Sequence, residues 1–204
     1  MNDTTFAYRA LAGVLLLGAL AYTEWRKHRQ LSRLREYAFL FATAGLAVAY
    51  AVVHDIITFA LAPEYFFVLK DVAGDTFFPN VAWLAARAGW TAGLAIGLGL
   101  LIANNPGRRE QLSYAALAQH IRFPLVWSLA AAIGGGLYAR YWMPGALSGW
   151  GLEHPLAVVT VWGIHIGSYV GALLGLAHGC FRVLRARADF AACYPLDASS
   201  PLAG

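Results

Sequence analysis

The stretch Tyr50-Ala-Val-Val-His-Asp-Ile-Ile-Thr-Phe-Ala-Leu-Ala-Pro-Glu-Tyr-Phe66 places ionisable side chains at the end of a long apolar segment. The segment begins near Tyr37, and Pro63 ends it because proline cannot continue the hydrogen-bond ladder of a helix. A charged side chain in a membrane-spanning helix costs about 2.5 to 3.5 kcal/mol on insertion scales, so it needs a partner. We therefore expect His54 and Asp55 to face other helices rather than lipid.

Composition assigns the chain to the integral membrane proteins. Of its 204 residues, 59% are hydrophobic and 13% are charged, whereas about 25% of the residues in soluble domains are charged. The arginines flank apolar segments and do not form one basic patch, so the net charge of +4 reflects topology and excludes a nucleic-acid partner. The two cysteines, Cys180 and Cys193, lack the spacing of metal ligands or of a redox pair.

Five apolar segments are long enough to cross a bilayer, which takes about 20 residues per helix. They predict an all-α fold, an integral membrane bundle of five transmembrane helices. The whole chain, residues 1–204, forms a single membrane domain that ends in a polar cytoplasmic tail at 183–204. The spans lie approximately at 6–25, 37–61, 81–103, 123–142 and 155–182.

Positive charge predicts how these helices thread the membrane. Eleven of the fifteen lysine and arginine residues follow the first, third and fifth spans, whereas only Arg9 and Lys70 lie in the opposite segments. Cytoplasmic loops of membrane proteins carry the excess of positive charge. We therefore expect the N-terminus outside and the C-terminus in the cytoplasm, as in a multi-pass protein of the bacterial cytoplasmic (inner) membrane.

Polar side chains of the second span lie on one face of its predicted helix. Tyr50, His54 and Thr58 follow one another at intervals of four residues, and residues three or four apart are neighbours on a helix. Asp55 precedes Thr58 by three residues and joins the same face. This face should contact protein, because lipid offers no hydrogen-bond partner.

Polar residues of three spans have similar predicted depths. At about 1.5 Å per residue, Asp55 lies roughly 8 Å, Arg87 roughly 10 Å and His165 roughly 15 Å below the outer ends of their helices. Tyr169 follows His165 by four residues and extends a second polar face. Glu64 lies just beyond the second span and is placed to fold back over the mouth of this site.

One interpretation is an outer-facing intramembrane site that binds a metal ion or relays protons. Imidazole and carboxylate groups are suitable ligands for zinc, iron or copper, and chains of acidic and histidine side chains carry protons in pumps. Both an enzyme and a small transporter fit this interpretation. The predicted metal ligands are His54, Asp55, Glu64 and His165.

The alternative interpretation is a structural or accessory subunit of a membrane complex. Here Asp55 and Arg87 form a stabilising ion pair, and the histidines make hydrogen bonds between helices. The partners are then the lipid bilayer and either a second copy of the chain or a larger complex. The sequence carries no haem or nucleotide motif, because it has no bis-histidine pair and Gly134-Gly135-Gly136 lacks the following Lys-Ser/Thr of a phosphate loop.

The motif His54-Asp55-x-x-Thr58, followed by Pro63-Glu64-Tyr65-Phe66, resembles a known signature. It is similar to a widespread family of small, uncharacterised bacterial multi-pass membrane proteins with the pattern His-Asp-Gln-Ile/Val-Thr…Glu-Tyr-Phe. Ile56 stands where that pattern has glutamine, and His165-x-x-Ser168-Tyr169 looks like a second shared element. The resemblance implies no reaction. It implies that one group of residues belongs together: His54, Asp55, Thr58, Glu64 and Tyr65.

Overall fold

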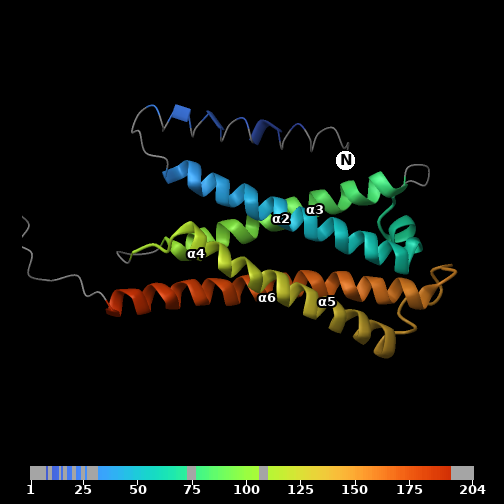
Figure 1. Ribbon diagram of the computed structural model, residues 1–204. Coiled ribbons are helices and arrows are strands. Elements are labelled where there is room, and N and C mark those ends of the chain that lie inside the picture. The colour runs from blue at the N-terminus through green and yellow to red at the C-terminus, as the bar shows by residue number, and fades with distance from the viewer. Residues whose placement is uncertain are drawn as a thin grey trace, which may run out of the picture.

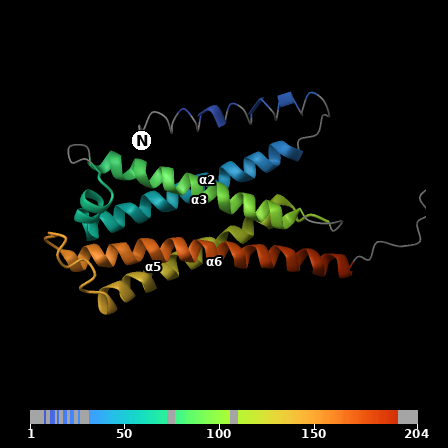
Figure 2. The same ribbon diagram turned by 180° about the vertical axis from the view of Figure 1, so that it is seen from behind.

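Four long helices that run in alternating directions make up most of the computed structural model (Figures 1 and 2). The structure describes residues 32–72, 77–105 and 110–193, together with isolated positions between 8 and 26. No strand occurs among these residues, which confirms the predicted all-α fold for them. The elements are α2 (Ser32–Leu61), the π-helical turn η1 (Tyr65–Leu69), α3 (Phe77–Asn104), α4 (Tyr114–Ala118), the 3-10 turn η3 (Gln119–Ile121), α5 (Arg122–Trp142) and α6 (Pro155–Cys193).

Length and composition make four helical segments suitable for crossing a membrane, and all four were predicted as spans. The predicted first span, 6–25, lies largely outside the described residues, although its described positions are helical. The number of spans and the orientation of the termini therefore stay predictions. The four segments are Leu34–Leu61, Pro79–Asn104, Tyr114–Trp142 and Pro155–Asp189.

Helix α6 continues beyond its predicted end at residue 182. Residues 183–193, predicted to begin the polar tail, extend the helix instead. The physical reason is Arg187, which is only 2% exposed. Its Nη1 donates to the carbonyl of Ala103 at 3.2 Å, and its Nε donates to the carbonyl of Glu110 at 3.1 Å. Arg187 thus satisfies a carbonyl in the last turn of α3, which has no partner within its own helix.

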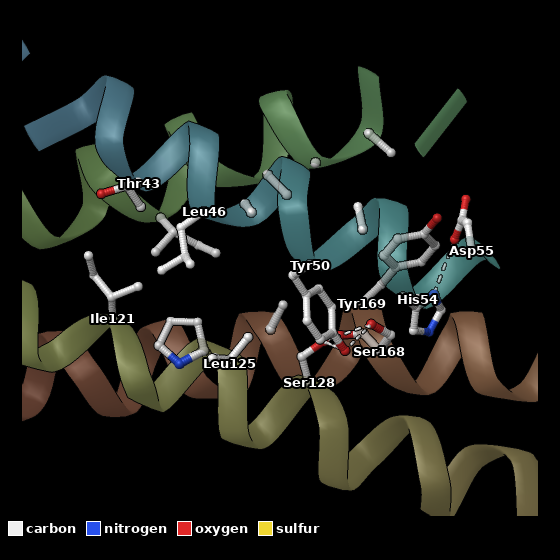
Figure 3. A pocket seen from close by; sticks show the side chains of 18 of the residues that line it. Thr43, Leu46, Tyr50, His54, Asp55, Ile121, Leu125, Ser128, Ser168 and Tyr169 are labelled. Carbon is white, nitrogen blue, oxygen red and sulfur yellow. Dashed lines mark hydrogen bonds and ion pairs between the residues drawn. The ribbon is translucent and has the colours of Figure 1, made fainter. Parts of the chain in front are cut away.

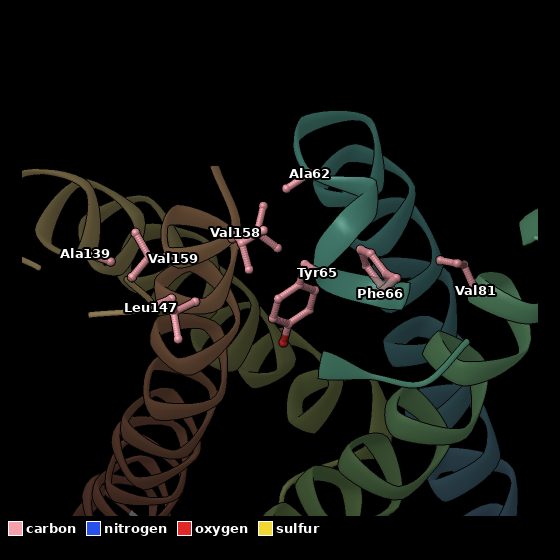
Figure 4. Close-up of a cluster of buried hydrophobic side chains, with 9 residues drawn as sticks. Ala62, Tyr65, Phe66, Val81, Ala139, Leu147, Val158 and Val159 are labelled. Carbon is pink, nitrogen blue, oxygen red and sulfur yellow. The ribbon is translucent and has the colours of Figure 1, made fainter. Parts of the chain in front are cut away.

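The segment after α2 folds back into the bundle at its described residues. Its turn η1 buries Tyr65 and Phe66, which are 1% and 0% exposed. These two rings join a hydrophobic cluster at one end of the bundle (Figure 4). Other members of the cluster come from α3, α5 and α6 and include Val81, Ala139, Val158 and Val159.

Glycines allow the helices to pack as two close pairs, α2 with α3 and α5 with α6. On α6, glycine recurs at every fourth residue and faces the backbone of α5. A Cβ atom at Gly175 would lie 2.5 Å from the Cα of Pro124, and one at Gly167 would collide with the carbonyl of Ala131. Small residues at such positions let helix backbones approach closely in membranes. The series on α6 is Gly163, Gly167, Gly171 and Gly175.

Glycines also allow close backbone contact between α2 and α3. The glycine content of the third predicted span indicates such contact. A Cβ atom at Gly93 would lie 2.5 Å from the Cα of Ala44, and one at Gly89 would lie 2.7 Å from the carbonyl of Ala47. Between the two pairs, α3 packs along α6, whereas α2 contacts α6 more sparingly. The bundle is therefore tight within each pair and looser between the pairs.

We expect Gly167→Ala to destabilise the protein by about 1 to 3 kcal/mol, because the added methyl group overpacks the contact with α5. Gly134→Ala is the matched control, since outside its own helix turn no described atom lies within 4 Å of a Cβ atom at that position. It should be neutral or stabilising by up to about 1 kcal/mol through helix propensity. Thermal unfolding of both variants in detergent checks this expectation, and equal melting temperatures would contradict it.

Candidate metal site

Three side chains with metal-binding atoms meet between α2 and α6: His54, Asp55 and His165. One ligand atom of each lies within 4.8 Å of the others. The Oδ1 atom of Asp55 is 3.1 Å from Nδ1 of His54 and 3.9 Å from Nδ1 of His165. The two imidazole rings are roughly perpendicular, with centroids 4.9 Å apart. We call these three residues the His–Asp–His group.

The His–Asp–His group is buried, so each of its polar atoms needs a hydrogen-bond partner or a bound ion. Asp55 is 8% exposed and His165 is 3% exposed. The Nε2 atom of His54 is buried and has no hydrogen-bond partner among the described residues. Leaving a buried polar atom without a partner costs about 1 to 3 kcal/mol, so such an atom in a folded protein calls for an explanation. A bound metal ion supplies one.

Thr58 favours one tautomer of the His165 imidazole. Its hydroxyl donates to the carbonyl of His54 at 3.0 Å, so an oxygen lone pair is left to face Nε2 of His165 at 3.4 Å. That contact favours a proton on Nε2 and leaves a lone pair on Nδ1, the atom on the side of Asp55. A metal ion binds the nitrogen that carries the lone pair, and a hydrogen bond at the other nitrogen orients the ring.

Aromatic rings of η1 hold the imidazole of His165 in place. Tyr65 stacks on it with centroids 4.8 Å apart and an interplanar angle of 14°. Phe66 meets it edge-on at 5.9 Å. Burial, with the nearby Tyr169 and Asp55, raises the pKa of the Tyr65 phenol, which therefore stays protonated at neutral pH. The resemblance implied that Tyr65 belongs with the site, and the structure brings it there.

Glu64, a predicted metal ligand, is not brought into the His–Asp–His group. Its Oε1 accepts a hydrogen bond from the backbone N–H of Glu153 at 2.7 Å, and its Oε2 accepts one from His154 at 2.9 Å. These amides immediately precede Pro155, the first residue of α6. A carboxylate at a helix N-terminus is favoured by the helix dipole. Glu64 thus ties η1 to the start of α6.

Arg87 is not the partner of Asp55 in the described part of the chain. There the Asp55 carboxylate is at hydrogen-bond distance from Nδ1 of His54 and lies 3.9 Å from Nδ1 of His165. Arg87 is partly buried on α3, and its carbonyl accepts a hydrogen bond from the hydroxyl of Thr91 at 3.1 Å. Similar depth in the membrane did not bring Arg87 and Asp55 together as a pair, because depth does not say which way a side chain faces around its helix.

A cavity extends from the His–Asp–His group between the two helix pairs (Figure 3). Tyr169 lines it near the group, and farther along it three hydroxyls meet. The hydroxyl of Tyr50 lies 3.1 Å from Oγ of Ser128, which lies 2.7 Å from Oγ of Ser168. Ser128 was missed in the sequence, where the only indication was a lone serine in the apolar stretch 123–137.

Comparison with known proteins adds no assignment. No family model matches the chain, and neither a curated protein nor a solved structure is similar to it. The resemblance to the membrane proteins with the His-Asp…Glu-Tyr-Phe pattern therefore stays a prediction. The geometry of the site carries the functional argument by itself.

We expect Glu64→Gln to lower the stability of the protein by about 1 to 2 kcal/mol, because it removes a charged acceptor from two backbone amides. Glu153→Gln is the matched control: it removes the same charge from the loop that Glu64 contacts and keeps the backbone amide that binds Glu64. Thermal unfolding, with hydrogen exchange of residues 152–158, measures the difference. The idea fails if both variants melt and exchange alike.

Proposed function

We propose that the chain is a multi-pass protein of the bacterial cytoplasmic membrane whose His–Asp–His group binds a divalent transition-metal ion. The observation that carries the proposal is the convergence of three donor side chains beside a buried nitrogen of His54 that has no partner in the described structure. Nitrogen and carboxylate ligands suit zinc, iron and copper.

The spacing of the donors supports a metal ion. Around a tetrahedral zinc ion with bonds of about 2.1 Å, neighbouring ligand atoms lie roughly 3.4 Å apart. One ligand atom from each of the three residues lies within 4.8 Å of the others, so modest side-chain rotations bring the donors to that spacing. Three protein ligands leave one position open, as in catalytic rather than structural zinc sites.

The charge distribution supports an outer-facing site. The start of α2, the short helix α4 and the end of α6 share one end of the bundle (Figure 1). The sequence places its basic clusters around these segments, and such clusters favour the cytoplasmic side. Turn η1 and the loop 143–154 lie at the other end, where the His–Asp–His group is found. In this orientation the site opens toward the outer face.

Each part of the site has a role in this proposal. His54, Asp55 and His165 hold the ion, and Thr58 and Tyr65 orient the second histidine. The ion would act as a Lewis acid that polarises an oxygen of a bound molecule. The carboxylate of Asp55 offsets part of the positive charge, and the apolar cavity keeps water scarce, which strengthens the electrostatic interactions there.

Proton transfer is a second candidate function, favoured by the position of Asp55 between two imidazoles. In metal-free protein the same three groups can pass a proton from one to the next. An accessory subunit of a membrane complex is the remaining alternative. Its proposed basis, an Asp55–Arg87 pair, has less support now that the contacts of Asp55 are with histidines.

We expect one metal ion per chain when the protein is purified in mild detergent without chelators. His54→Ala and His165→Ala should each lower metal affinity by more than about 100-fold, because even a change behind a ligand costs 10- to 100-fold. His178→Ala is the matched control, since that imidazole accepts a hydrogen bond from Trp127 at 3.2 Å, away from the group. Elemental analysis beside size-exclusion profiles measures this. Metal-free, well-folded wild type would overturn the proposal.

We expect Thr58→Val, which keeps the shape but removes the hydroxyl, to lower metal affinity by about 10- to 100-fold. Its physical basis is the loss of the oxygen that faces Nε2 of His165. Thr58→Ser keeps that oxygen and should bind metal nearly as the wild type does. Competition with a chelating dye gives the affinities. Equal affinities of the two variants would show that Thr58 does not orient the ligand.

A further inference from the structure

The cavity beside the His–Asp–His group is about as long as a single hydrocarbon chain. It is lined along α2 from Thr43 to Asp55, a rise of twelve steps that spans about 18 Å at 1.5 Å per residue. The hydrocarbon core of a bilayer is about 30 Å thick, so one leaflet holds chains of similar length. The cavity lies within the spans of α2, α3, α5 and α6, where lipid rather than water surrounds the protein.

The wall of the cavity is chemically suited to such a chain. Small and apolar residues from both helix pairs form most of it, and the hydroxyls of Tyr50, Ser128 and Ser168 bond to one another. The polar groups with capacity left for a ligand are therefore concentrated at the His–Asp–His end. Among the apolar lining residues are Leu46, Ala51, Ile96, Leu125 and Ala172.

The charge of the loaded site selects the head group. A divalent ion with the carboxylate of Asp55 and two neutral imidazoles carries one net positive charge. An uncompensated charge in an apolar interior is costly, so an anionic ligand at the open position is favoured over a neutral one. A carboxylate is an anion that also binds transition metals through oxygen.

We propose that this cavity holds a long-chain carboxylate, whose head group binds the metal ion of the His–Asp–His group and whose hydrocarbon chain lies between the helix pairs. The inference rests on the proposed metal site and names the class of molecule that it binds. The fatty acid enters from the surrounding lipid. Along the cavity, where α2 and α6 do not touch each other, its chain fills the space between them.

The test uses the full chain in detergent, loaded with zinc, and tritiated palmitic acid as the probe. Ala51→Leu and Ala172→Leu place larger side chains in the cavity and should weaken palmitate binding at least tenfold while metal content stays at one ion per chain. Ala49→Leu makes the same change on an exposed position of α2 and should bind palmitate as the wild type does. Equal binding by all three variants, or no binding to metal-loaded wild type, would overturn the inference.

Cobalt(II) in place of zinc tests the head group separately. Its visible absorption responds to a change of ligand, so palmitate should alter the spectrum of the wild type and leave that of Ala51→Leu unchanged at the same concentration. Palmitate that binds without altering the spectrum would overturn the metal–carboxylate contact. Metal analysis before palmitate is added reports on the proposed function alone, so its failure is distinguishable from failure of this inference.

Discussion

A carboxylate buried among apolar helices is the constraint on which the rest of the site depends. Asp55 is 8% exposed, and its carboxylate lies beside two imidazoles, one from its own helix and one from α6. A buried charge must be paired or bind a metal ion. Meeting that requirement draws α2 toward α6 at this level, and it makes the position of His165 critical. Thr58, Tyr65 and Phe66 surround that ring accordingly.

The glycines determine where the bundle is closed and where it is open. Close backbone contact at Gly167 and Gly175 leaves no space between α5 and α6, and Gly93 does the same between α2 and α3. Lipid tails are as apolar as the side chains, so the helices associate mainly through packing of this kind. Between the pairs, alanines such as Ala51 and Ala172 leave the cavity that leads to the His–Asp–His group.

The four long helices were predictable, because apolar length alone indicates a membrane span, but the end of α6 was not. The convergence of Asp55 and His165 was predictable as well, since a helix rises by a constant amount per residue and depth can be counted. Depth does not give the direction in which a side chain points. Arg87 therefore looked like a partner of Asp55, and Glu64 looked like a ligand. Arg187 lies in a polar segment that was predicted as a tail. Its buried contacts depend on tertiary packing, which the sequence does not show.

Glu64 and Tyr65 are consecutive residues that hold two separate parts of the same helix. The carboxylate binds the amides that lead into α6, whereas the neighbouring ring stacks on His165 inside the bundle. The loop at the membrane surface and the buried imidazole are thus connected through a single peptide unit. A displacement of that loop would therefore move the ring as well, which couples the position of the loop to the geometry of the His–Asp–His group.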